Sequence, residues 1–389
     1  MAYADWDQRP CGLWTTDSVS LNPTGFFFRG QMPRRDNRRN TGYSGITVRK
    51  ISVPNDIPTM VSMKFGIRLP TYVWKDAGAS RESLLSFAER AEQLGFDSLW
   101  TVDHYLQALP SYRATFLDAL TTLSAVAART ERIRLGTAIL VLPLRNPVLL
   151  AKRVATLDVL SNGRFDFGVG VGWHEGEFDA VGVPIHERGK RTDEILHILK
   201  RLFTEENVSY EGEFYRFKDV TILPKPVQKP YPPIWVAGGQ TVKRVYYDRS
   251  YKARPTKLSR ALKRIARDGD GWLATSVSVP ELLQKDWERI SSYAKELGRD
   301  PSGIRKAQTT YMFVTQNVED ARKHYDRIVG KDFDEFVLKS SYFIGSTREI
   351  VEKIEERRKM GIDLMILTPV TLDVNQLDLW ADEIKSRFE

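Results

Sequence analysis

Cysteine is almost absent from the 389-residue sequence, in which Cys11 is the only one. A single thiol excludes an internal disulfide and a metal site built from several cysteines, and it is typical of a reducing, cytoplasmic setting. Long apolar runs are also missing. None approaches the roughly 18 residues of a membrane-spanning helix, so no membrane segment is expected.

Three common catalytic motifs are missing as well. The sequence contains no P-loop and no G-x-S-x-G turn, which argues against a P-loop NTPase and an α/β-hydrolase. Residues 174–177 read HEGE and lack the H-E-x-x-H spacing that places two histidines on one metal ion. We therefore predict no metal site.

Residues 1–62 show no clear hydrophobic period and are rich in Pro, Gly, Asn, Ser and Arg. We expect them to form a disordered N-terminal extension. Asp5 and Asp7 stand where a secretory signal would carry basic residues. Regular patterning begins at Met63, so the predicted organisation is an extension, 1–62, followed by one folded domain, 63–389.

From Met63 onward, short β-rich segments alternate with amphipathic helices, which is the pattern of βα units around a parallel sheet. Eight strands are predicted, whereas doubly wound sheets usually have five or six, so the expected fold class is α/β, a (β/α)8 TIM barrel with insertions. The predicted strands are 63–69, 97–102, 132–140, 164–172, 233–239, 271–275, 304–314 and 363–370. The predicted helices are 81–94, 116–129, 147–162, 189–203, 280–297 and 346–360, with a surface hairpin at 207–217.

Functional side chains of such barrels lie at the C-terminal ends of the strands. Asp103 and His104 follow the second predicted strand, in the run SLWTVDHY. His104 is a candidate general base because imidazole titrates near neutrality; alternatively it closes the loop by hydrogen bonding. Asp103 either accepts hydrogen bonds from a cofactor or caps the next helix.

Two glycine-rich segments end further strands. Residues 168–172 have glycine at every second position, which either lets a flat ligand approach or fits a crowded barrel interior. Residues 237–240, AGGQ, follow the fifth strand, where their backbone N–H groups and an amide could hold a phosphate; a plain turn is the alternative. Both segments would meet Asp103 and His104 at one rim.

Positive charge is concentrated in residues 242–268, where ten Lys or Arg face two Asp, so the local excess of +8 equals the net charge of the chain. Such a cluster is a solvated helix face, a nucleic-acid patch or a receptor for a small polyanion. No recognised nucleic-acid motif accompanies it, so no nucleic-acid partner is expected.

The runs LGFDSLWTVDHY, GRFDFGVGVGWHEGEFDAVGVP and PKPVQKPYPPIWVAGG resemble the luciferase-like monooxygenase family, in its branch that uses the deazaflavin coenzyme F420. The resemblance covers about residues 63–370. It implies a bacterial luciferase-like barrel that binds a flavin or deazaflavin at its rim and forms a homodimer.

The resemblance also implies roles for individual residues. His104 would exchange a proton with the substrate, and the bond between Ala138 and Ile139 aligns with a non-prolyl cis peptide of relatives. The expected cofactor contacts are Asp103, Ala138, Ile139, Gly170, Gly172, Ala237, Gly238, Gly239, Gln240, Lys243 and Arg244, the last two along the anionic F420 tail. The expected substrate pocket is Trp74, Tyr105 and Trp173.

The function expected from the resemblance is hydride transfer between F420 and a small organic substrate, with a separate reductase to regenerate the reduced cofactor. Trp173 departs from the family's sugar-phosphate dehydrogenases, which have an acid after the G-x-G-x-G run, so a sugar phosphate is not the expected substrate. Two alternatives stay open. One is an FMN-dependent monooxygenase on the same barrel, and the other is a non-catalytic binding protein that uses residues 242–268.

Overall fold

The computed structural model describes residues 62–74, 77–78, 80–107, 115–241, 258–317, 319–320, 322–323, 339–371 and 373–388. The chain divides into two units, Met1–Ile57 and Pro58–Glu389, and all described residues belong to the second. The extension predicted for residues 1–62 therefore lies outside the described residues, apart from its last residue.

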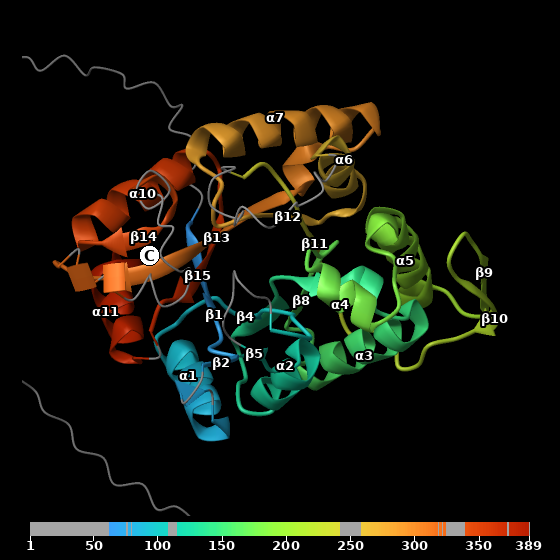
Figure 1. Ribbon diagram of the computed structural model, residues 1–389, viewed down its shortest axis with the longest axis horizontal. Coiled ribbons are helices and arrows are strands. Elements are labelled where there is room, and N and C mark those ends of the chain that lie inside the picture. Colours follow the sequence, from blue (N-terminus) through green and yellow to red (C-terminus); the bar gives the residue numbers. More distant parts are fainter. Residues whose placement is uncertain are drawn as a thin grey trace, which may run out of the picture. The chain divides into compact units, whose positions relative to one another are not determined.

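Eight parallel strands close into a barrel (Figure 1). Each strand pairs in parallel with the next, and the last pairs with the first, so the predicted α/β barrel is confirmed. All eight predicted strands are present. They are β1 (Lys64–Arg68), β4 (Ser98–Thr101), β6 (Arg134–Thr137), β8 (Phe165–Gly170), β11 (Ile234–Ala237), β12 (Gly271–Ala274), β13 (Arg305–Val314) and β15 (Leu364–Pro369).

Helices surround the barrel (Figure 1). The six predicted helices are confirmed as α1 (Arg81–Gln93), α2 (Ala119–Ala127), α3 (Pro147–Leu160), α5 (Arg188–Thr204), α7 (Pro280–Glu296) and α10 (Thr347–Lys359). Two of them begin at serine caps, since Ser80 accepts from the third backbone N–H of α1 and Ser346 forms a capping box with Glu349 in α10. Within the described ranges the structure adds α4 (Glu175–Ala180), α6 (Leu258–Asp268) and α11 (Asn375–Glu383) to the predicted helices.

Two tryptophans fill the interior of the barrel. The indole rings of Trp100 and Trp235 meet edge to face, with their centroids 6.2 Å apart, and both side chains are fully buried. A Cβ atom on Gly66 or Gly136 would lie 2.5 Å or 2.4 Å from the Trp100 ring, so the neighbouring strands need glycine there. The interior below the rim is therefore packed with side chains.

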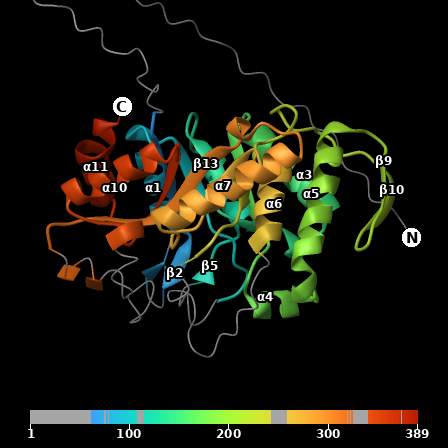
Figure 2. The same cartoon turned by 90° about the horizontal axis from the view of Figure 1, so that it is seen from above.

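The additions after β1, β4 and β8 lie on one side of the barrel (Figure 2). A small antiparallel sheet joins β2 (Tyr72–Trp74), β3 (Ala77–Gly78) and β5 (Thr115–Phe116), and it lies on the same side as α4. The predicted hairpin is confirmed as β9 (Val208–Glu211) and β10 (Arg216–Val220). Two short strands, β7 (Leu140–Val141) and β14 (Phe343–Gly345), extend the pairing of β8 and β13.

Candidate active site

A buried carboxylate orients His104. The Nδ1 atom of His104, in the segment after β4, lies 3.1 Å from Oε1 of Glu177 on α4. The same oxygen accepts the backbone N–H groups of Tyr105 at 2.7 Å and Leu106 at 3.2 Å. Glu177 is 1% exposed. Although burial opposes its charge, the bonds from His104 and the two N–H groups outweigh that effect and hold its pKa below the usual range.

These contacts define the state of the imidazole. An ionised Glu177 can only accept hydrogen bonds, so Nδ1 of His104 carries the hydrogen. In the neutral ring the lone pair is then on Nε2, the atom suited to take a proton from a substrate. The arrangement matches the predicted general base, although the role itself stays a prediction. Glu177 was not predicted. The only sequence feature that could have indicated it is an acidic residue three positions after His174, in the segment that follows the fourth barrel strand.

Aromatic rings enclose His104. Its ring centroid lies 5.7 Å from Trp173 in an edge-to-face contact and 5.3 Å from Phe116. Trp173 is thus beside the candidate base, as the substrate-pocket prediction requires. The neighbouring His174 has a buried Nδ1 atom for which the described residues supply no hydrogen-bond partner, and burial lowers its pKa despite the nearby charge of Glu177.

The other two predicted pocket residues differ in position. Tyr105 is 40% exposed, and its hydroxyl accepts a hydrogen bond from Arg145, whose guanidinium also lies 4.9 Å from the Tyr105 ring centre. Tyr105 therefore belongs to the rim. Trp74 is part of β2, but its side chain lies outside what the structure describes.

Asp103 is part of the rim's internal framework. Its Oδ1 atom lies 2.6 Å from Nη2 of Arg145, and its Oδ2 atom accepts the backbone N–H of Val141 at 2.9 Å. The side chain is buried; this burial raises the pKa of Asp103, and Arg145 opposes the rise. Asp103 does not cap α2, whose cap is Asp118, so the capping alternative is wrong. A cofactor contact for Asp103 stays a prediction.

The connection from β6 to β7 bulges against β8. The peptide bond between Ala138 and Ile139 is cis, as the resemblance implied. A Cβ atom on Gly170 would lie 2.4 Å from the Ile139 side chain, and one on Gly172, at φ +72°, would lie 2.5 Å from Val141. The glycines thus make room for the chain's own bulge, which favours the crowded-interior alternative. Contacts of Gly170 and Gly172 with a cofactor stay predictions.

The predicted phosphate turn already uses several of its donors. The backbone N–H of Gln240 donates to Oδ2 of Asp286 at 2.5 Å, and its Nε2 donates to Oδ1 at 3.0 Å. The backbone N–H of Gly238 donates to the carbonyl of Leu273 at 3.3 Å. Fewer donors are therefore left for a phosphate than the sequence suggested, and the phosphate role of residues 237–240 stays a prediction.

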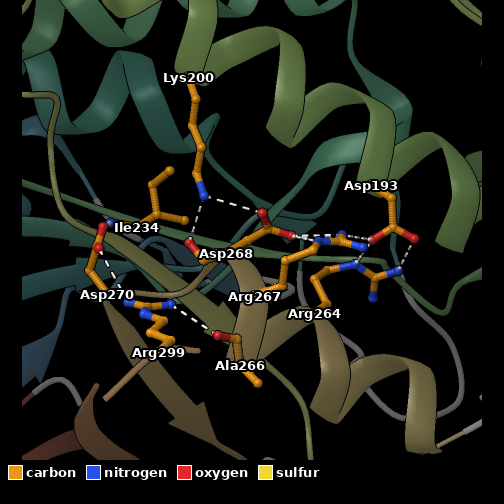
Figure 3. Close-up of polar contacts among 9 residues, drawn as sticks. All are labelled: Asp193, Lys200, Ile234, Arg264, Ala266, Arg267, Asp268, Asp270 and Arg299. Carbon is orange, nitrogen blue, oxygen red and sulfur yellow. Dashed lines mark hydrogen bonds and ion pairs between the residues drawn. The ribbon is translucent and has the colours of Figure 1, made fainter. Parts of the chain in front are cut away.

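Two cations in the described end of the basic segment, residues 258–268, are held in ion pairs within the protein. Figure 3 shows Arg264 and Arg267 of α6 directed at Asp193 of α5, with nitrogen–oxygen distances of 2.8 Å and 2.6 Å. Arg267 also pairs with Asp268, which in turn binds Lys200. These cations attach α6 to α5 and do not form an open anion receptor. Lys243 and Arg244, the predicted contacts of the F420 tail, lie outside the described residues.

Two further properties concern the described residues alone. Their His, Asp and Glu side chains form no group of three that could hold a metal ion. Each of their helices is too short or too polar to cross a bilayer.

Comparison with known proteins gives a consistent assignment. Residues 63–245 match the family model of the luciferase-like monooxygenases. The chain is 27% identical over 286 residues to an FMNH(2)-dependent dimethylsulfone monooxygenase of Pseudomonas putida, covering 64% of this chain and 72% of that one. It is 32% identical over 249 residues to an F420-dependent glucose-6-phosphate dehydrogenase of Amycolatopsis mediterranei, covering 63% of this chain and 65%, just under two thirds, of the relative.

A solved structure supports the same assignment over a longer range. Monooxygenase RslO1 from Streptomyces bottropensis superimposes with a TM-score of 0.70 at 28% identity, covering 84% of this chain and 100% of that one. The fold, the family model and the two relatives agree, so the resemblance inferred from the sequence is confirmed. Residues 63–245 of this chain match the luciferase-like monooxygenase family, and the barrel as a whole is similar to that of a solved monooxygenase.

Proposed function

We propose that this protein is an F420-dependent oxidoreductase that transfers a hydride between the deazaflavin and a small, fairly apolar organic substrate. The observation that carries the proposal is the pair His104 and Glu177, a candidate base fixed by a buried carboxylate at the rim of a luciferase-like barrel. The similarity to an F420-dependent dehydrogenase supports the choice of cofactor.

The rim offers groups that fit a flavin or deazaflavin. Such a ring is flat and carries carbonyl oxygens and ring nitrogens that accept hydrogen bonds. The rim has a small side chain at Ala138, and it has buried Nε–H donors on Arg68 and Arg145 for which the described residues supply no acceptor. When bound, the deazaflavin would supply or accept the hydride.

The protein's own residues would manage the proton. When a substrate alcohol becomes a carbonyl, its carbon loses a hydride and its hydroxyl loses a proton, and Nε2 of His104 would take that proton. The negative charge of Glu177 would stabilise the imidazolium that results, and in the reverse direction His104 would return the proton. Trp173 and Phe116, which contact His104, would exclude water and favour an apolar substrate.

A second candidate is an FMN-dependent monooxygenase. It is favoured by the similarity to the dimethylsulfone monooxygenase, which covers 72% of that protein. This function would require reduced FMN from a separate reductase and a dry pocket that protects an oxygen-reactive cofactor.

Anaerobic titration separates the two candidates. Purified protein is titrated with F420 and with FMN, each oxidised and reduced, while absorbance reports binding. Hydride transfer from reduced F420 to small ketones is then followed without oxygen. We expect F420 to bind more tightly than FMN and to be oxidised anaerobically by at least one ketone. Binding of FMN alone, with oxygen uptake on reduction, would replace the proposal with the second candidate.

A further inference from the structure

Arg68 ends the first barrel strand on its inward face. Alternate residues of a strand share a face, and a Cβ atom on Gly66 would touch Trp100 inside the barrel. Phe65 and Ile67 instead pack in the hydrophobic core that includes the surrounding helices. Arg68 is therefore directed inward, one layer nearer the rim than Gly66.

The guanidinium of Arg68 is only partly used by the protein. Its Nη2 atom donates to the carbonyl oxygen of Ala138 at 2.8 Å. Its Nε atom is buried, and the described residues supply it with no hydrogen-bond acceptor. A guanidinium has five N–H donors, and leaving a buried one unsatisfied is unfavourable.

The neighbouring acids do not balance this charge. Asp103 is bound by Arg145 and a backbone N–H, and Glu177 is bound by His104 and two backbone N–H groups. Asp103 and Glu177 are thus engaged by other groups. Arg68 therefore keeps a buried donor beside the bulge at Ala138, where a bound anion would gain a charge-assisted hydrogen bond.

We propose that Arg68 is the binding site for a planar, delocalised anion at the rim. The anion would share its negative charge over an N–C–O or O–C–O group. The planar guanidinium can donate two parallel hydrogen bonds to such a group. Two sources carry it: the ring of the reduced cofactor after loss of a proton, or a carboxylate of the substrate. The first source rests on the proposed function, whereas the second does not.

The test compares Arg68→Gln with Arg68→Lys, and Arg348→Gln serves as a control because it removes one charge at an 88% exposed side chain. Affinities are measured for oxidised and reduced F420 and FMN, and for benzoate against its neutral analogue benzamide by calorimetry. Thermal melting confirms folding. If Arg68→Gln does not fold, Arg68→Lys is compared with the unmodified protein instead. Lysine keeps the positive charge but lacks the two parallel N–H donors of the guanidinium.

We expect Arg68→Gln to lower the affinity for the reduced cofactor at least tenfold and the affinity for the oxidised cofactor less than threefold. Arg68→Lys should lower the affinity for the reduced cofactor by a smaller factor. A tenfold loss of benzoate binding with benzamide and both cofactor forms unchanged would also support the site and assign the anion to the substrate. Equal effects on charged and neutral ligands, or none, would overturn it. If the unmodified protein binds neither cofactor, the proposed function fails and the benzoate comparison still tests Arg68.

Discussion

The backbone N–H and side-chain amide of Gln240 both donate to the carboxylate of Asp286, a side chain with 0% exposure. Asp286 comes from α7 and Gln240 from the turn after β11, so the contact ties one barrel loop to a neighbouring helix. Burial raises the pKa of Asp286, with the bonds from Gln240 opposing the rise. The carboxylate of Asp286 thus accepts hydrogen bonds from the groups of Gln240 that were predicted to bind a phosphate.

Removing this carboxylate should loosen the turn. We expect Asp286→Ala to lower the free energy of unfolding by about 1–3 kcal/mol, because the donors of Gln240 lose their acceptor. Urea unfolding measures the change. The exposed Asp382 supplies a control, and Asp382→Ala should stay within about 0.5 kcal/mol of the unmodified protein. Equal effects of the two substitutions would contradict the assigned role of Asp286.

His104→Ala should leave cofactor affinity within a few-fold and reduce kcat by roughly 10²–10⁴, the usual contribution of a general acid–base group. Steady-state kinetics on a substrate found by the anaerobic screen gives kcat, and absorbance titration gives the affinity. Near-normal turnover in this variant would show that the base is elsewhere and that His104 has a structural role.

Glu177→Gln tests the positioning of His104. Glutamine can still accept the N–H groups of Tyr105 and Leu106, but it removes the charge beside the imidazole. Loss of a charged hydrogen bond of about 1.5–3 kcal/mol corresponds to roughly a 10- to 100-fold fall in kcat. The value of kcat should fall more than KM changes, because Glu177 acts through His104 and not on the substrate. An unchanged kcat would contradict the positioning role.

Glu177→Gln should also change how the free energy of unfolding depends on pH. Because the pKa of Glu177 is held below its ordinary value of 4.5, folding favours the ionised carboxylate. That contribution to stability is present above pH 4.5 and is lost as the pH falls through the lowered pKa. The advantage of the unmodified protein over Glu177→Gln in unfolding free energy should therefore shrink below that pH. Denaturant unfolding across the range measures it, and a constant gap would contradict the prediction.

Gly168→Ala should destabilise the barrel strongly. A Cβ atom there would lie 1.7 Å from the backbone carbonyl oxygen of Thr137, which cannot move aside as a side chain can. We expect a loss of about 3 kcal/mol or more, at or above the usual range for overpacking. Gly303→Ala is the control, since nothing lies within 4 Å of that position. Thermal and urea unfolding should separate the two variants clearly, and similar stabilities would contradict the tight contact.

The basic segment gives a test of cofactor choice. Replacing Lys243, Arg244 and Arg249 together by Gln should weaken F420 binding, more for longer glutamate tails and at low ionic strength, with little effect on FMN. Exposed ion pairs contribute only about 0–1 kcal/mol each and are screened by salt, so the effect should be cumulative. Titration with F420 of different tail lengths measures it. Equal affinity of the unmodified protein for long and short tails would rule out this role.

The barrel could be predicted because each strand carries its own local pattern. Segments such as 63–69 and 363–370 are apolar and β-rich, and helices lie next to them in the sequence. Each of the eight strands can therefore be identified from its own residues, without knowing which strands it pairs with. Helix α6 was only one of three explanations of the charge cluster, because the sequence does not show that Arg264 and Arg267 are spaced to reach one acid on α5.

The site could be predicted only in part. His104 and Trp173 stand at strand ends, where the fold itself directs attention. Glu177, Arg145 and Arg68 act through contacts between segments far apart in the chain, with sequence separations of 73 for His104 and Glu177 and 42 for Asp103 and Arg145. No local pattern records such pairings. They follow only from the geometry of the closed barrel.

The paired indoles of Trp100 and Trp235 fill the interior of the barrel formed by the described strands. Ligands can then reach the inner face of the rim from one end alone. A ligand at this rim would therefore rest on the barrel's own core, so a substitution that shrinks either indole would change the floor of the site and the stability of the fold together.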